Sequence, residues 1–113
     1  MYWLIVGRDK PDHESIRLSA REAHREYIWR VDLPARLLVG SPLSDDDGAA
    51  MTGTWLLVEA PDRAAAEAFA EGDPYRRVGL FDRVEIAALH SVFDPRRFGL
   101  RSPAVSGGEP TRP

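Results

Sequence analysis

Thr52-Gly53-Thr54-Trp55-Leu56-Leu57-Val58-Glu59-Ala60 is the stretch that decides the fold. Side chains alternate between the two faces of a strand, so Trp55 and Leu57 share one face and their apolar neighbours share the other. Because both faces are apolar, we expect both to be covered, as they are in a strand at the centre of a sheet. The run Tyr2–Val6, which is followed by Gly7, is also apolar on both faces and predicts a second central strand.

Four further segments have the periodicity of regular structure. They are predicted strands at residues 35–42 and 83–93 and predicted amphipathic helices at residues 12–31 and 61–72. Asp12 is placed to cap the first helix, and Gly72 is placed to end the second. Asp45-Asp46-Asp47-Gly48 predicts a hairpin connection. The resulting order, β-α-β-β-α-β, predicts an α+β, ferredoxin-like fold with a four-stranded antiparallel sheet.

Two helices can cover only one face of such a sheet. The other face would carry large apolar side chains, from sets such as Tyr2, Leu4 and Trp55 or their neighbours. An apolar patch of that size is too large for a monomer. A second copy packed sheet against sheet is the simplest cover, so the sequence predicts a homodimer.

Length and composition limit the possible functions. We expect one domain, residues 1–100, and a disordered Pro-, Gly- and Ser-containing tail, residues 101–113. The net charge is −3 and no basic stripe occurs, so nucleic acid is not an expected partner. The apolar runs are far shorter than a membrane span. No cysteine is present, which excludes thiol nucleophiles and thiolate metal sites. We expect a cytoplasmic protein that uses no metal or other cofactor.

His24 is the strongest candidate for chemistry. It lies beside the apolar face of the first predicted helix, one turn from Arg21. An imidazole that is partly desolvated can transfer protons near neutral pH. The simpler interpretation is a histidine at the border of a helix face, bonded to a backbone carbonyl or to water.

Asp73, in Asp73-Pro74-Tyr75, is the candidate partner for that imidazole. Asp before Pro is also a common way to cap a short helix. Asp94-Pro95 repeats the pattern near the end of the chain. From spacing alone, capping is therefore the better interpretation of Asp73.

Three residues are candidates for substrate binding. Ser41 ends the second predicted strand, although an ordinary loop serine is the simpler interpretation. Arg21 lies four residues after Arg17 on the same helix side, and the two guanidinium groups could hold an anion, although such pairs more often form a solvated face. Tyr75 follows the Asp73-Pro74 break and completes this set.

These residues together resemble the YciI-like protein family, from the first strand to about Val92. The matching motifs are Arg17-Leu18-Ser19-Ala20-Arg21-Glu22-Ala23-His24, Arg36-Leu37-Leu38, Pro42-Leu43, Thr52-Gly53, and Asp73-Pro74-Tyr75 with Gly79. The resemblance implies a ferredoxin-like fold that dimerises into an α+β barrel. It also implies a His-Asp pair as the proposed active site, here His24 and Asp73 rather than Asp94. The chain departs from the family at Ser41 and at Pro34-Ala35, where glycine is usual.

The leading hypothesis is a cofactor-independent enzyme. His24 would act as general acid-base, oriented by Asp73, on a small cyclic or aromatic substrate positioned by Arg21, Ser41 and Tyr75. The accessible reactions are elimination, isomerisation and hydrolysis. The alternative is a non-catalytic homodimer that binds a small ligand or acts as an accessory module. A ring nitrogen of His24 within about 3.2 Å of an Asp73 oxygen, beside an open pocket, would favour the enzyme.

Overall fold

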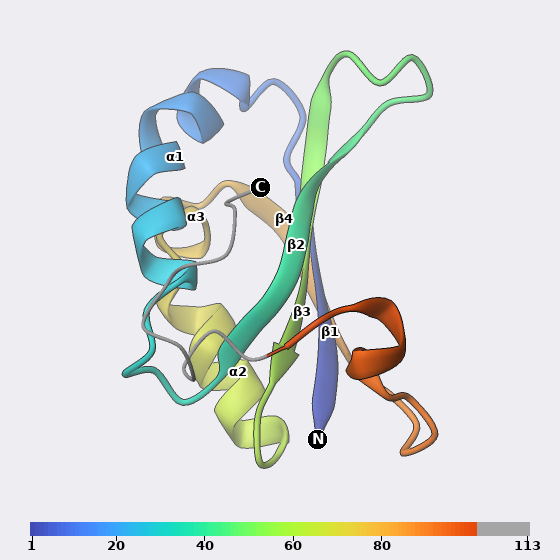
Figure 1. Cartoon of the computed structure of the whole chain (residues 1–113). Coiled ribbons are helices and arrows are strands. Elements are labelled where there is room, and N and C mark those ends of the chain that lie inside the picture. The colour runs from blue at the N-terminus through green and yellow to red at the C-terminus, as the bar shows by residue number, and fades with distance from the viewer. Residues whose placement is uncertain (102–113) are drawn as a thin grey trace.

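The computed structural model describes residues 1–101, in which four strands form one antiparallel sheet with the order β2-β3-β1-β4 (Figure 1). The strands are β1 (Tyr2–Asp9), β2 (Arg36–Ser44), β3 (Met51–Glu59) and β4 (Phe81–Ala88). β1 and β3 lie at the centre, as their apolar character on both faces predicts. The predicted tail, apart from Arg101, lies outside the described residues.

The helices lie together on one side of this sheet (Figure 1). They are α1 (Glu14–Ile28), α2 (Arg63–Gly72) and the short α3 (Pro74–Arg77), and a 3₁₀ turn, η1 (Pro95–Phe98), follows β4. The order of elements and of strands confirms the ferredoxin-like α+β fold. None of the helices within residues 1–101 has the length and apolar character needed to cross a membrane.

Several predicted boundaries are wrong, and each has a local cause. β1 continues past Gly7 to Asp9, because Gly7 leaves room for the Phe81 ring. A Cβ there would meet ring carbons at 2.7 Å. β4 begins at Phe81 and ends at Ala88, not at Phe93. Its partner β1 begins at Tyr2, whose carbonyl accepts a last bond from the Leu89 N–H, so pairing stops there.

The first helix also differs from its prediction at both ends. Asp12 adopts a left-handed backbone, with φ of 59°, and is not the N-cap. His13 occupies that position and makes no side-chain capping bond. The helix ends at Ile28, so Val31 lies beyond it and is exposed. α2 lies closer to its predicted bounds. Asp62 caps its start by accepting the backbone N–H of Ala65 at 2.9 Å.

The main core lies between the sheet and the helices. It contains Trp3, Ile5, Ile28, Leu56, Val58 and Phe69 among other apolar side chains. A smaller buried group, Ala20, Tyr75, Leu80 and Phe81, packs where α1 meets α3. Four polar side chains are buried as well: Arg17, His24, Thr54 and Asp73. Buried polar groups need partners, so these four residues locate the site.

The three α-helices all lie away from the opposite face of the sheet (Figure 1). Leu57 on β3 pairs with Leu4 on β1 and with Val39 on β2, and Trp55 pairs with Val6, which forms an apolar band across three strands. The segment after β4 crosses to this side of the sheet (Figure 1), where the Phe93 ring meets the Tyr2 ring edge-on at 5.4 Å. The chain therefore covers one end of this face itself.

Candidate functional site

α1 presents polar side chains to the interior of the protein. Its buried residues are Arg17, Ala20, His24 and Ile28, spaced by three and four as one helix face requires. Ala23, next to His24 in the sequence, is exposed. The buried face includes an arginine and a histidine because other elements supply partners for both.

The partner of His24 is Asp73, which comes from the break between α2 and α3. The His24 Nδ1 and Asp73 Oδ1 atoms are 2.7 Å apart, and the two residues are only 6% and 3% exposed. A carboxylate can only accept a hydrogen bond, so Nδ1 carries the proton. This distance is shorter than the limit of about 3.2 Å within which a hydrogen bond between the two side chains favours the enzyme hypothesis. The neutral ring then has its lone pair on Nε2, the nitrogen that a substrate can reach.

Asp73 also caps α3. Its Oδ1 accepts the backbone N–H of Tyr75 at 2.9 Å, so one oxygen holds both the start of α3 and the imidazole of α1. Asp94 caps η1 in the same way, accepting the backbone N–H of Arg96 at 3.0 Å. Its carboxylate then binds the Arg96 side chain and meets no histidine. Capping is thus common to both Asp-Pro motifs, and only Asp73 has the additional partner.

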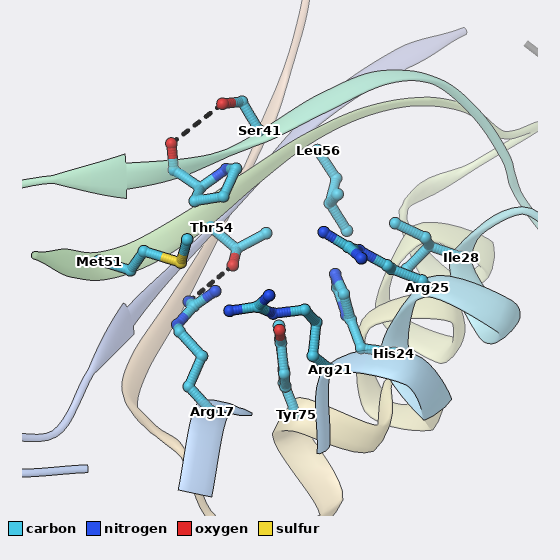
Figure 2. Close-up of a pocket in the computed structure, with 11 residues that line it drawn as sticks. Arg17, Arg21, His24, Arg25, Ile28, Ser41, Met51, Thr54, Leu56 and Tyr75 are labelled. Carbon is cyan, nitrogen blue, oxygen red and sulfur yellow. Dashed lines mark hydrogen bonds between the residues drawn. The ribbon is translucent and has the colours of Figure 1, made fainter. Parts of the chain in front are cut away.

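Tyr75 forms the base of the site. Its ring stacks on the His24 imidazole, with centroids 3.9 Å apart and planes 13° apart. The Arg17 guanidinium lies 4.7 Å from the centroid of the Tyr75 ring, so Tyr75 stands between Arg17 and His24 (Figure 2). Burial raises the pKa of the Tyr75 hydroxyl, although the nearby Arg17 and Arg21 guanidinium groups act in the opposite direction. The hydroxyl therefore keeps its proton at neutral pH.

The Arg17 side chain is held by hydrogen bonds to two strands. Its guanidinium donates to both carboxylate oxygens of Asp9, at 2.8 and 3.0 Å, and to the Thr54 hydroxyl at 2.8 Å. A bidentate pair of this kind fixes the plane of the guanidinium. Asp9 ends β1 and Thr54 lies on β3, so these two partners are adjacent only in the folded chain. Sequence analysis does not identify either of them, because nothing in their spacing links them to Arg17.

An open pocket lies above this base (Figure 2). Its empty volume is about 390 Å³ when the space at the mouth is included, and its enclosed part is small. The residues that line it come from α1, β2, β3 and α3 and are Arg17, Arg21, His24, Arg25, Ile28, Ser41, Pro42, Met51, Thr54, Leu56 and Tyr75. None of them is acidic. Within residues 1–101, no three histidine or acidic side chains are grouped in a way that could hold a metal ion.

The three predicted binding residues differ in how they reach this pocket. Arg21 and Tyr75 extend side chains towards it (Figure 2). Ser41 forms part of the wall, but its hydroxyl donates to the Pro42 carbonyl at 3.0 Å and points away from the arginines (Figure 2). Ser41 pairs with Trp55 in the sheet, which places its side chain on the face without helices.

Comparison with known proteins identifies relatives along most of the chain. A family model described as the YCII-related domain matches residues 1–90. Protein YciI of Escherichia coli O6:H1 is 35% identical over 98 residues, which cover 82% of this chain and all of that protein. An uncharacterized protein of Haemophilus influenzae is 30% identical with the same coverage.

Solved structures show the same fold. The 5-chloro-2-hydroxyhydroquinone dehydrochlorinase TftG from Burkholderia phenoliruptrix AC1100, in complex with 2,5-dihydroxybenzoquinone, superimposes with a TM-score of 0.69. It is 28% identical, and the alignment covers 80% of this chain and 94% of that one. An antibiotic biosynthesis monooxygenase aligns with a TM-score of 0.51 at 17% identity, covering 80% and 98% of the two chains. The second likeness concerns the fold alone.

Replacing each capping aspartate by alanine should separate the two Asp-Pro motifs. Asp73→Ala removes the cap of α3 and leaves the buried His24 without its carboxylate, and we expect a loss of about 3 kcal/mol in the free energy of unfolding. Asp94→Ala removes an equivalent cap from an exposed turn and should cost clearly less. Urea unfolding of both variants measures the difference. Equal losses would show that Asp73 acts only as a cap.

The raised pKa of Tyr75 predicts how stability changes at alkaline pH. Above pH 10.0, the ordinary tyrosine value, the unfolded chain releases the Tyr75 proton while the folded chain keeps it. Stability should therefore fall as the pH rises from 10.0 through the raised folded-state pKa. Tyr75→Phe keeps the ring and should make this fall less steep, whereas Tyr2→Phe, at a more exposed position, should change it less. Identical slopes for the wild type and Tyr75→Phe would contradict the assignment.

Proposed function

The chain belongs to the YCII-related domain family, and on that premise we propose that it is a cofactor-independent enzyme. His24 acts as general acid-base on a small cyclic or aromatic substrate, and Asp73 orients its ring. The observation that carries the proposal is the 2.7 Å hydrogen bond between Asp73 and His24, whose ring lines an open pocket. The pair is built like the histidine-carboxylate part of a hydrolytic triad.

The pair suits reactions in which His24 takes one proton from the substrate and later gives it up. The Nε2 lone pair takes a proton from the substrate, and the imidazolium that forms is stabilised by the Asp73 carboxylate. In an elimination, the leaving group departs as an anion with its bonding electrons, and the proton stays on His24 until solvent removes it. An isomerisation returns the proton to another atom of the substrate. No electron acceptor is needed in either case.

The comparison with TftG favours a hydroxylated ring as the first substrate to test. The name of that protein describes loss of chloride from a chlorinated hydroquinone, and its ligand is a hydroxylated quinone. At 28% identity the likeness supports the class of reaction and leaves the substrate of this chain to experiment. The stacked Tyr75 and His24 rings line the pocket together and hold the imidazole in a fixed orientation beside it.

We further propose that the enzyme is a homodimer whose two sheets pack face to face. None of the helices α1, α2 and α3 lies over the apolar band of Val39, Leu57, Leu4, Trp55 and Val6, and the segment after β4, up to residue 101, covers only one end. Leu57 is buried and the other four side chains are partly buried in the single chain. Partly covered apolar side chains gathered on one face of a sheet are typical of an interface between copies. Trp55→Arg should therefore give a folded monomer in sedimentation, whereas Val78→Arg, at an exposed position on the helical side, should remain dimeric. A monomeric wild type would contradict the proposal.

Turnover of 5-chloro-2-hydroxyhydroquinone tests the catalytic assignment. We expect the wild type to release chloride, and His24→Ala to lower kcat/KM by roughly 10²–10⁴-fold, the usual contribution of a general acid-base group. His90→Ala is the control, since His90 lies in an exposed turn where its ring only accepts the Val92 N–H. Wild-type activity in His24→Ala would reject the assignment. A wild type that binds hydroxylated rings but transforms none would favour the non-catalytic binding module.

A further inference from the structure

Three arginines of α1 form a stripe along one side of the pocket. Arg17, Arg21 and Arg25 are spaced by four residues, so they lie one turn apart on the same side of the helix, and all three line the pocket. Like charges four residues apart on one side of a helix repel each other and destabilise the helix slightly. This stripe therefore lowers the stability of α1 slightly unless negative groups lie nearby.

Two of the three positive charges have partners within the chain. Arg17 makes its bidentate pair with Asp9 and is almost completely buried. Arg25 lies 3.5 Å from the Glu22 carboxylate of the same helix. Arg21 forms no ion pair with any residue from 1 to 101. Its guanidinium extends into the pocket above Tyr75 (Figure 2).

The side chains that line the pocket are positive overall. Asp9 pairs with Arg17 and Glu22 pairs with Arg25, whereas the buried Asp73 carboxylate hydrogen-bonds the neutral His24 ring from behind the lining. Within residues 1–101 no acidic side chain lines the pocket, so Arg21 is the lining cation that faces a ligand without an ion-pair partner. A partly enclosed cation with five N–H donors in a fixed fork is suited to a carboxylate or another planar oxyanion.

Part of the pocket is apolar. Pro42, Met51 and Leu56 line it from β2 and β3, and Ile28 lines it beside Arg25 on α1 (Figure 2). A ligand that fits both parts has a flat apolar body and one anionic group. Inorganic anions lack the apolar body, and neutral aromatic molecules lack the charge.

We propose that the pocket takes a cyclic or aromatic monoanion, a ring bearing one carboxylate or one ionised enol, whose negative group is bound by Arg21. The proposal rests on the function assigned to His24 and names the class of substrate for that site. Arg21 holds the oxyanion, and the ring lies in the pocket beside His24, within reach of Nε2. When His24 removes a proton from the ring, the electron pair that it leaves behind delocalises towards the oxygen that Arg21 contacts. A fixed cation at the place where negative charge grows lowers the barrier.

Arg21 is then distinct from Arg17 in its role. Arg17 is a positioning residue, since its Nε and Nη2 donors are used by Asp9 and Thr54 and its guanidinium lies over the Tyr75 ring. Arg21 contacts the ligand directly. Its replacement should therefore change ligand affinity without changing the fold.

Calorimetric titration of the full chain with 2,5-dihydroxybenzoate and 2,5-dihydroxybenzamide tests the proposal. These probes share the ring and differ in one charge. We expect the wild type to bind the carboxylate more tightly than the amide, with an affinity that falls as salt is added. Arg21→Gln should weaken carboxylate binding by roughly 10- to 100-fold, the value of a charge-assisted hydrogen bond, and should leave amide binding unchanged. Arg76→Gln, on the exposed side of α3, is the matched control and should behave as wild type.

The outcomes separate this proposal from the assignment of His24. Three results would each overturn the role of Arg21, whatever the turnover assay gives. The first is equal affinities for the two probes in the wild type, and the second is an equal loss for both probes in Arg21→Gln. The third is a larger loss of carboxylate binding in Arg25→Gln than in Arg21→Gln. His24→Ala should keep the preference for the carboxylate. If that variant keeps both the preference and full turnover, the acid-base function fails and the anion site stands.

Discussion

One carboxylate oxygen links the two parts of this protein that form the site. Oδ1 of Asp73 accepts the backbone N–H that begins α3 and lies 2.7 Å from the imidazole of α1. A buried carboxylate without partners would cost several kcal/mol, so the chain folds in a way that supplies both. Pro74 then fixes the direction in which α3 leaves. The position of α1 over the sheet and the position of Tyr75 under the imidazole both follow from this contact.

The fold could be predicted from the sequence because its determinants are local and periodic. Strands that are apolar on both faces must be central, and the Asp-Gly turn joins two neighbouring strands. The ends of elements could not be predicted in this way. β4 stops where β1 begins, and the path into α1 depends on a left-handed Asp12 that no pattern in the sequence indicates. Both are consequences of pairing and chain path rather than of composition.

The site was only partly accessible to the same reasoning. His24 can be chosen from its place on a helix, but spacing could not choose Asp73 over Asp94, since both cap short helices in nearly identical motifs. The choice came from the resemblance to a family, and the structure brings Asp73 and His24 together. Asp9 and Thr54 could not be found, because the sheet alone brings them to Arg17. Ser41 illustrates the reverse, since its side chain lies on the other face of the same sheet.

The protonation of the His24 ring provides the most direct test of this account. Nitrogen-15 NMR at a pH where the ring is neutral distinguishes a proton on Nδ1 from one on Nε2. If the Asp73 carboxylate accepts from Nδ1, the wild type holds the Nδ1–H form, and Asp73→Ala shifts the population towards the Nε2–H form. A wild-type ring with its proton on Nε2 would contradict the account, because the nitrogen facing the pocket would then have no lone pair to take a proton.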